Sequence, residues 1–367
     1  MQNLSLTDFV DLSDSPSLEL LNNDRVADLT GLPKKGVLKS TGLSKRYILK
    51  DGKNALDLAN EVTDTFLQKT GIRANNIGGI ALVHTSYNKE KKIEQEIAQA
   101  IADRIGVHRE LVTAISFGCA GFPKVLSEAA KLMEHIGDDK NCLILITETP
   151  SEMIDARDQA CTPIFADGAI ATTMKRGEGH RVLFVETEDI PATGIPDGEN
   201  IFEIVEKDVY TFNRTVERRV VFIMNKNLTF ENGTRAIEQA TRQSLKRLTE
   251  DEEFNGRRVI IVPHQPSSRM IRLLQQHVTP DLIQEYAAKG MHGMDFVDGF
   301  EGMGNIISGT IPSVLARLKD LLSKKPPQKG DIILIPAAGI CINDPGKKMT
   351  IGRGALEWNP DGWKKSE

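Results

Sequence analysis

The stretch LVTAISFGCAGFPKVLSEAAKLMEHIG, residues 111–137, decides the fold of this chain. It begins with a β-rich run, residues 111–117, and passes through Gly118 and Cys119 directly into a helical pattern. Gly118 allows a sharp turn, and the small residues after Cys119 leave its thiol unobstructed. At a helix start, free N–H groups and the macrodipole stabilise a thiolate, which is the nucleophilic form. The local pattern leaves two interpretations open, a nucleophilic Cys119 and a cysteine packed in the core.

Alternating helices and strands surround this stretch. In the first half we predict helices over residues 55–69 and 93–105, and strands over residues 77–86, 142–149 and 163–174. The β-α-β-α-β order predicts a mainly parallel sheet that is covered by helices.

The second half repeats this order. The matching segments are helices over 233–248, 267–278 and 304–322, with strands over 257–265 and 331–339. The sequence therefore predicts two similar halves, residues 1–189 and 233–367. Residues 190–232 are polar and irregular in pattern, and we expect them to form a connecting insertion.

Composition excludes several functional classes. The chain has 367 residues with Lys+Arg 46 against Asp+Glu 51, a net charge of -5 that argues against nucleic-acid binding. It has no apolar run long enough for a membrane span, and its acidic N-terminus does not read as a secretory signal, so we expect a cytoplasmic protein. The four cysteines form no CxxC pair, which argues against a structural zinc site or a disulfide framework. We predict no metal and no cofactor.

Two further residues are candidates for catalysis. His264 follows a buried strand in VIIVPHQP, and the carboxyl ends of strands in open sheets collect catalytic groups. Asn305 follows GFEGMG and precedes an apolar helix, in the place that Cys119 holds in the first half. The alternatives are an inert loop histidine and a helix-capping asparagine. The functional interpretation is that the Asn305 amide donates a hydrogen bond to a developing enolate or carbonyl oxygen.

Several short motifs together resemble a known family. They are Cys-Ala-Gly-Phe from Cys119, Pro-His-Gln around His264, Gly-Asn…Ile-Pro around Asn305, and the segments TGLSKR at 41–46 and FADGA at 165–169. In this order they resemble the β-ketoacyl-ACP synthase III group of the thiolase superfamily, from about residue 29 to 358. The resemblance implies an α/β, thiolase-like, five-layered αβαβα fold, with two similar halves, mainly parallel mixed sheets and a homodimeric assembly.

The resemblance also implies roles for these residues. Cys119 would accept an acyl group from an acyl-CoA or acyl carrier protein thioester. His264 and Asn305 would stabilise the enolate of a second thioester or assist its decarboxylation, so that Claisen condensation gives a β-ketoacyl product. The Cys119 backbone N–H, with Gly339 from an altered C-terminal turn, would form the oxyanion hole. Such chemistry serves fatty-acid-like, specialised lipid or polyketide biosynthesis.

Glu94 stands where many synthase III enzymes have phenylalanine. In this respect the chain resembles head-to-head condensing enzymes of olefin biosynthesis and α-pyrone synthases, in which such a glutamate serves the neighbouring subunit as a base. An alternative mechanism is therefore non-decarboxylative condensation with Glu94 as base. Otherwise Glu94 is one of several acids that favour a helix start. A further alternative, acyl transfer to an alcohol or amine, is disfavoured by Asn305.

Basic residues are candidates for docking an acidic carrier protein. Arg269 and Arg272 follow Pro-His-Gln and would flank the tunnel entrance by resemblance. The other candidates are Lys39, Lys45 and Arg46. Gly36 and Ser40 replace the residues that grip the CoA adenine in the family, which favours a carrier-bound acyl donor. The alternative is that these charges only solvate the surface.

Overall fold

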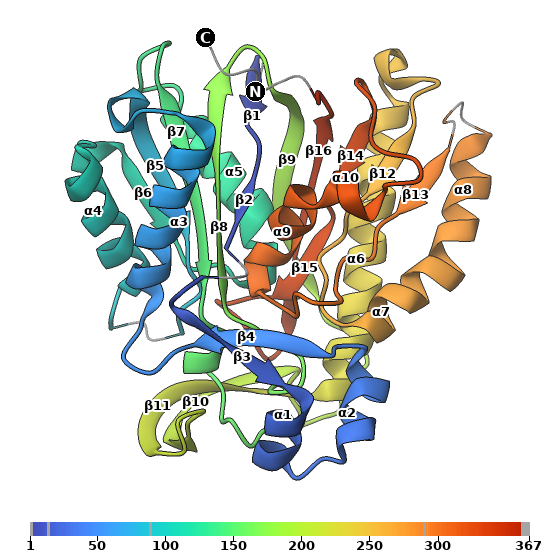
Figure 1. Ribbon diagram of the computed structural model, residues 1–367. Helices are drawn as coiled ribbons and strands as arrows, with labels where there is room; N and C mark the ends of the chain where they lie inside the picture. The colour runs from blue at the N-terminus through green and yellow to red at the C-terminus, as the bar shows by residue number, and fades with distance from the viewer. Residues whose placement is uncertain (1–2, 13–14, 88–89, 289–290, 292, 361–367) are drawn as a thin grey trace.

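The computed structural model describes residues 3–12, 15–87, 90–288, 291 and 293–360 of the chain. It has an α/β architecture in which helices lie against a large mixed sheet (Figure 1). None of the helices in these residues is long and apolar enough to cross a bilayer.

Within the described residues, one hydrogen-bonded sheet contains twelve strands in the order β13-β12-β14-β16-β9-β1-β8-β7-β5-β6, with β15 on β16 and β2 on β8. The strands are β1 (Leu4–Leu6), β2 (Val10–Asp11), β5 (Ile77–Val83), β6 (Val112–Ile115), β7 (Asn141–Glu148), β8 (Gly168–Arg176), β9 (His180–Pro191), β12 (Val259–Ile261), β13 (Met294–Phe296), β14 (Ile332–Leu334), β15 (Ala337–Ile340) and β16 (Lys348–Glu357).

The strand pairing repeats between the halves. Strand β5 lies parallel to both β6 and β7, and β12 lies parallel to both β13 and β14. On the inner side, β8 is antiparallel to β7, and β16 is antiparallel to β14. The antiparallel strands β1, β8, β9 and β16 join the halves in the middle of the sheet. The expected α/β fold with two similar halves is confirmed.

Local sequence signals explain the ends of several helices. The long helix of the first half, α3 (Ala55–Thr70), begins at a capping box between Asn54 and Asp57 and ends at Gly71 in the left-handed conformation. The other helices of the halves are α4 (Ile93–Ile105), α5 (Gly121–Leu132), α6 (Lys226–Thr249), α7 (Ser268–Leu273), α8 (Thr279–Ala287), α9 (Thr310–Ala316) and α10 (Leu318–Leu321).

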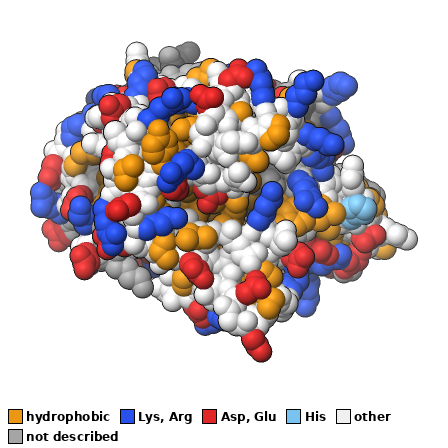
Figure 2. Space-filling model, turned by 90° about the horizontal axis from the view of Figure 1, so that it is seen from below, with side chains coloured by type: hydrophobic (Ala, Val, Ile, Leu, Met, Phe, Trp, Pro, Cys, Tyr) orange, Lys and Arg blue, Asp and Glu red, His pale blue; other side chains and the backbone are white. Residues whose placement is uncertain are grey.

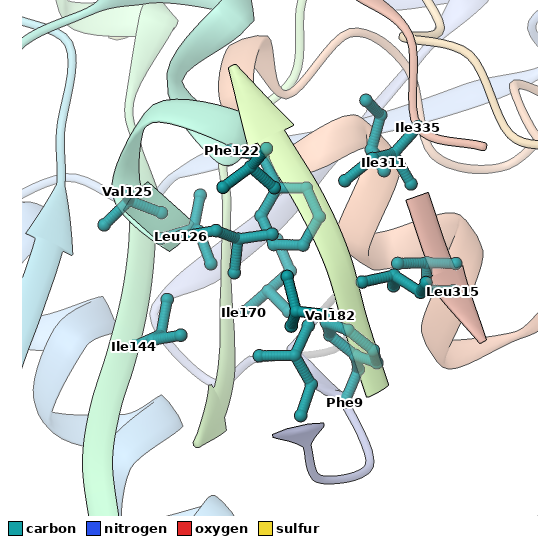
Figure 3. Packing of buried hydrophobic residues seen from close by; sticks show 14 of the residues in the cluster. Phe9, Phe122, Val125, Leu126, Ile144, Ile170, Val182, Ile311, Leu315 and Ile335 are labelled. Atoms are coloured by element: carbon teal, nitrogen blue, oxygen red, sulfur yellow. The ribbon is translucent and has the colours of Figure 1, made fainter. Parts of the chain in front are cut away.

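Three hydrophobic clusters show how these helices are layered. The central cluster contains residues of α5 and α9 together with strands of both halves, among them the residues labelled in Figure 3: Phe9, Phe122, Val125, Leu126, Ile144, Ile170, Val182, Ile311, Leu315 and Ile335. A second cluster packs α3 and α4 on strands of the first half, and a third packs α6 and α8 on strands of the second half. The order helix–sheet–helix–sheet–helix is the expected five-layered arrangement.

The insertion contains regular structure that its polar pattern did not predict. Strands β10 (Phe202–Tyr210) and β11 (Val216–Met224) form an antiparallel hairpin, and α6 begins at Lys226, earlier than predicted. The hairpin is charged on its exposed positions, whereas Phe202 and Phe222 are buried, so polarity hid the strand pattern. It lies below the large sheet, near α1 (Asn23–Thr30), α2 (Lys34–Thr41) and the β3 (Leu18–Asn22)–β4 (Lys45–Leu49) pair (Figure 1).

Two predicted elements of the second half are broken in the structure. Residues 304–322 form a 3₁₀ turn (Ile307–Gly309) followed by α9 and α10 rather than one helix. Ile307, with a φ of 42°, departs from helical backbone at the start of the 3₁₀ turn, and Arg317, with a φ of -111°, separates α9 from α10. Residues 331–339 divide into β14 and β15 on either side of Pro336, which has no N–H for the ladder.

Candidate active site

Cys119, His264 and Asn305 line one cavity of about 620 Å³ at the lower end of the sheet. Cys119 comes from the first half, and the other two come from the second half. The hairpin, α2, α6 and α7 contribute to the cavity walls. The structure thus brings together three residues that are distant in the sequence, at the strand ends where we expected them.

Cys119 lies in a 3₁₀ turn (Gly118–Ala120) that leads directly into α5. Gly118 makes this turn with a φ of 67°, a conformation that side-chain-bearing residues rarely adopt. The backbone of Gly339 packs against the turn: a Cβ on Gly339 would lie 2.9 Å from the Cβ and 2.9 Å from the N of Cys119. The predicted oxyanion residue Gly339 is therefore next to Cys119, and only glycine permits this approach.

The surroundings of Cys119 disfavour its thiolate form. Burial, followed by the nearby Glu148 carboxylate, raises the pKa of Cys119 to about 12, and the hydrogen bond from its own backbone N–H only partly opposes them. Desolvation thus opposes the thiolate stabilisation that we expected from the helix start. Cys119 must lose its proton when it attacks.

His264 is a buried, neutral histidine with a fixed ring. It follows β12, and its backbone N–H donates to the Pro336 carbonyl at 2.8 Å. Its Nδ1 lies 2.6 Å from the Thr310 hydroxyl. This contact fixes the orientation of the imidazole and leaves Nε2 for a substrate. Burial lowers the pKa of His264 to about 3. At rest the ring is therefore neutral, and it can accept a hydrogen bond from a substrate or donate one.

Asn305 is held by both its backbone and its side chain. Its N–H donates to Ile164 at 2.9 Å, and its carbonyl accepts from Ala166 at 3.1 Å, within the FADGA segment. Its Oδ1 accepts from the Ile307 N–H at 3.0 Å, which is the capping interaction considered above. Because Oδ1 is used in the turn, the Nδ2 donors remain for the cavity. Asn305 therefore caps the turn and presents an amide N–H₂ as well.

Two residues near Cys119 escaped the sequence analysis. Glu148, at the end of β7, is fully buried and accepts hydrogen bonds from Thr85 and Ser308. Burial raises the pKa of its carboxyl to about 7. Tyr87 lines the cavity, and burial and the charges of Cys119 and Glu148 raise its pKa well above the usual value. Glu148 ends the apolar strand β7, and Tyr87 follows the polar residues after β5 (Ile77–Val83); no local motif marks either residue.

The other predicted residues lie further from Cys119. Glu94 occupies the first turn of α4, half-buried, and is not among the described residues that line the cavity. Arg269 and Arg272 are exposed at the edge of the cavity. Arg46 is fully buried and donates to Asn23, so docking by Arg46 is wrong.

Sequence comparison finds similarity to one family. Residues 114–189 match the 3-oxoacyl-[acyl-carrier-protein] synthase III family. The β-ketoacyl-[acyl-carrier-protein] synthase III of Clostridium novyi (strain NT) is 24% identical over 354 residues, covering 93% of this chain and 95% of the relative. The synthase of Campylobacter fetus is 24% identical over 326 residues, covering 88% and 91%. The chain is a β-ketoacyl-ACP synthase III-like condensing enzyme. It is thus an acyltransferase of a class that forms carbon–carbon bonds, as the motifs predicted.

Solved structures show that this synthase III-like chain has the thiolase fold. A 3-oxoacyl-(acyl-carrier-protein) synthase III has a TM-score of 0.71 at 18% identity, with 97% of this chain and 100% of that chain covered. The priming β-ketosynthase of the R1128 polyketide pathway has a TM-score of 0.71 at 20% identity, with 96% of both chains covered. OleA of Xanthomonas campestris, with bound lauric acid and lauroyl-CoA, has a TM-score of 0.66 at 17% identity, with 97% and 99% covered.

Proposed function

We propose that this enzyme joins two acyl thioesters by decarboxylative Claisen condensation through an acyl-Cys119 intermediate. The observation that carries the proposal is the placement of Cys119, His264 and Asn305 around one cavity. A nucleophile and two groups that can hydrogen-bond to an oxygen are what ping-pong acyl condensation needs.

In the first half-reaction, the Cys119 sulfur attacks the carbonyl carbon of an acyl thioester. The bond from carbon to the donor sulfur breaks, and the proton lost by Cys119 leaves with the donor thiol. Because the Cys119 pKa is about 12, proton loss and attack are coupled, and His264 is the neutral group in the same cavity that can relay the proton. The Cys119 N–H and the adjacent Gly339 backbone are the proposed oxyanion donors.

In the second half-reaction, a malonyl-type thioester places its carbonyl oxygen between His264 and Asn305. Loss of CO₂ leaves an enolate, whose carbon attacks the acyl carbon and expels the Cys119 sulfur. Hydrogen bonds from the neutral imidazole and the Asn305 Nδ2 stabilise the enolate oxygen as its charge develops. The product is a β-ketoacyl thioester.

Intact-mass measurement tests the nucleophile. Wild-type enzyme incubated with acyl-CoA or acyl-carrier donors should gain one acyl mass, and Cys119→Ala should gain none. Cys142→Ala is a matched control, because Cys142 is a buried thiol on β7 outside the cavity. Acylation that persists in Cys119→Ala would exclude this function.

Exposed basic residues at the cavity edge support a carrier-bound or CoA-bound substrate. Lys39, Lys226, Arg269 and Arg272 line the cavity, are exposed and form no ion pair with any residue described in the structure. Viewed from below, lysine and arginine side chains lie around hydrophobic ones on this face (Figure 2). Free cations beside an apolar cavity suit a phosphate-bearing arm or an acidic carrier.

An unpaired strand edge supports the proposed homodimer. Strand β6 ends the large sheet, and every residue from 111 to 117 is only partly buried. An edge strand with half-exposed apolar side chains is a template for pairing with another chain. Because β6 runs directly into the Cys119 turn, a partner subunit at this edge would lie close to the active site. Sedimentation of the purified protein tests this assembly, and a monomer would exclude it.

The alternative mechanism with Glu94 as base depends on this dimer. Helix α4 contacts β6, so Glu94 at its start lies on the side of the chain that a partner would approach. The fold likeness to OleA is consistent with this alternative. Mixing Glu94→Gln with Cys119→Ala subunits tests it: restored condensation in mixed dimers would show that one subunit supplies Glu94 to its partner's site.

A further inference from the structure

Glu148 has a set of hydrogen bonds that the proposed chemistry does not use. Its Oε2 accepts from the Thr85 N–H at 2.9 Å, and its Oε1 accepts from the Thr85 hydroxyl at 3.0 Å and from the Ser308 hydroxyl. All three residues are buried. A carboxylate that is fully removed from water and accepts three hydrogen bonds holds its partners firmly, because losing it would leave buried donors unpaired.

Each partner of Glu148 belongs to a turn that carries a proposed catalytic residue. The Thr85 hydroxyl also accepts from the Gly118 N–H at 3.2 Å, and Gly118 begins the turn that contains Cys119. Ser308 lies in the 3₁₀ turn after Asn305, and that turn is attached to the Asn305 side chain through Ile307. Glu148 is therefore bonded to the Cys119 turn on one side and to the Asn305 turn on the other.

The Asn305 turn needs an external tie. Ile307 has a φ of 42°, which is unfavourable for a β-branched residue and persists only where the surroundings enforce it. The Ser308–Glu148 hydrogen bond is one such constraint, since it fixes the residue immediately after Ile307 to a strand of the other half.

We propose that Glu148 is a positioning residue that fixes Cys119 and Asn305 relative to each other, by holding the turns of both through Thr85 and Ser308. This inference rests on the proposed function, because it assigns the two turns to the two half-reactions. The network also has an electrostatic side: the Glu148 carboxylate, after burial as the larger cause, raises the pKa of Cys119 and of Tyr87. His84, from the same strand end as Thr85, is instead bonded to the Thr147 carbonyl.

Single-hydroxyl variants separate the two arms of this network. Ser308→Ala removes the tie to the Asn305 turn, and it should slow malonyl-thioester decarboxylation on the order of tenfold while acyl loading of Cys119 stays within about twofold. Thr85→Val removes the acceptor of the Gly118 N–H and should slow acyl loading more than decarboxylation. Both rates are measured separately, by intact mass and by CO₂ release. Equal effects of both variants on both half-reactions would overturn the positioning role.

Glu148→Gln tests the charge with little change of shape. Because the carboxylate raises the Cys119 pKa, its removal should lower the pH midpoint of Cys119 alkylation by iodoacetamide by about one unit. At a fixed pH, alkylation should then be about tenfold faster. Glu152→Gln is the matched control: it is a partly buried glutamate that accepts from Thr149 and lines a different cavity. A midpoint shared by wild type, Glu148→Gln and Glu152→Gln would overturn the charge effect.

These results are distinguishable from failure of the proposed function. Alkylation reports on the thiol alone and needs no acyl substrate. Loss of acylation in Cys119→Ala, with network variants that behave like wild type, would retain the function and overturn the role of Glu148. Acylation that survives in Cys119→Ala would overturn the function itself.

Discussion

The close approach of Gly339 to Cys119 gives a sharp prediction for Gly339→Ala. The added Cβ would lie 2.9 Å from the Cys119 Cβ, 2.9 Å from the Cys119 N and 3.3 Å from the Ala120 N. Carbon atoms in good contact are about 3.5–4.0 Å apart, so either the Cys119 turn or strand β15 must move by roughly 0.6 Å or more. Backbone atoms cannot rotate away as a side-chain end can, and β15 is held by its pairing with β16.

The expected cost divides between stability and chemistry. Overpacking of this kind costs about 1–3 kcal/mol of unfolding free energy. Displacement of a nucleophile by about 1 Å costs on the order of 10²-fold in rate, so a shift of roughly 0.6 Å should slow acyl loading of Cys119 by about ten- to a hundredfold. Intact-mass time courses measure loading, and thermal unfolding measures stability.

Gly36→Ala is the matched control for this substitution. Gly36 lines the same cavity, but its nearest heavy atoms, on Pro33, would be 3.7 Å from an added Cβ, which is an ordinary contact. We expect Gly36→Ala to load Cys119 at the wild-type rate. If Gly339→Ala also loads Cys119 within about twofold of wild type, the inferred packing of Gly339 on the nucleophile turn is wrong.

Three further predictions concern the cavity edge, its wall and the response of the fold to acid. Charge reversal of Arg269 and Arg272 to Glu should raise the KM for an acyl carrier protein donor at least tenfold at low salt and leave the KM for a short, uncharged thioester unchanged. If the double substitution changes the KM for both donors equally, docking at this edge is refuted. Phe222→Ala opens the cavity wall where Phe222 contacts Phe165 and Phe202, so in a competition between acyl donors the enzyme should shift its preference toward longer acyl groups. The substitution should lower the free energy of unfolding by about 3 kcal/mol. An unchanged donor preference would show that this wall does not set chain length. Burial lowers the pKa of His84 from its usual 6.5 to about 4. Between these pH values the unfolded chain binds more protons than the folded chain, so the free energy of unfolding falls as the pH drops from 6.5 to 4, by about 3 kcal/mol from this group. In urea titrations, His84→Gln should be less sensitive to acid than wild type between pH 6.5 and 4, and identical slopes would contradict the assignment.

Much of the fold could be predicted because its signals are local. The helix predicted over residues 93–105 agrees with α4, and that over 55–69 with α3, since apolar spacing and the following glycines mark both. The hairpin β10–β11 was missed because its strands carry charges on exposed positions. The division of residues 304–322 was missed because no local signal marks the left-handed conformation of Ile307 or the interruption at Arg317.

The residues of the candidate site also differ in whether the sequence could identify them. Cys119, His264 and Asn305 could be proposed from sequence because their motifs, taken together, resemble one family; the local pattern around each residue left its alternative open. Glu148 and Tyr87 could not, because their contacts with the Cys119 turn join segments distant in the sequence. Glu94 and the basic pair remain predictions whose tests are stated above.

By itself, the sequence determined the strand–turn–helix at residues 111–137 and the repeated order of elements, because these depend on periodicity and turn chemistry within short windows. It nominated Cys119 as the nucleophile only through the resemblance of several motifs to one family. Only the tertiary structure decided the direction in which the Cys119 pKa shifts and the approach of Gly339. Burial and the charge of Glu148 raise the thiol pKa, and both arise from residues brought together by packing of the two halves. Desolvation is a property of the folded surroundings, and no local pattern of residues encodes it.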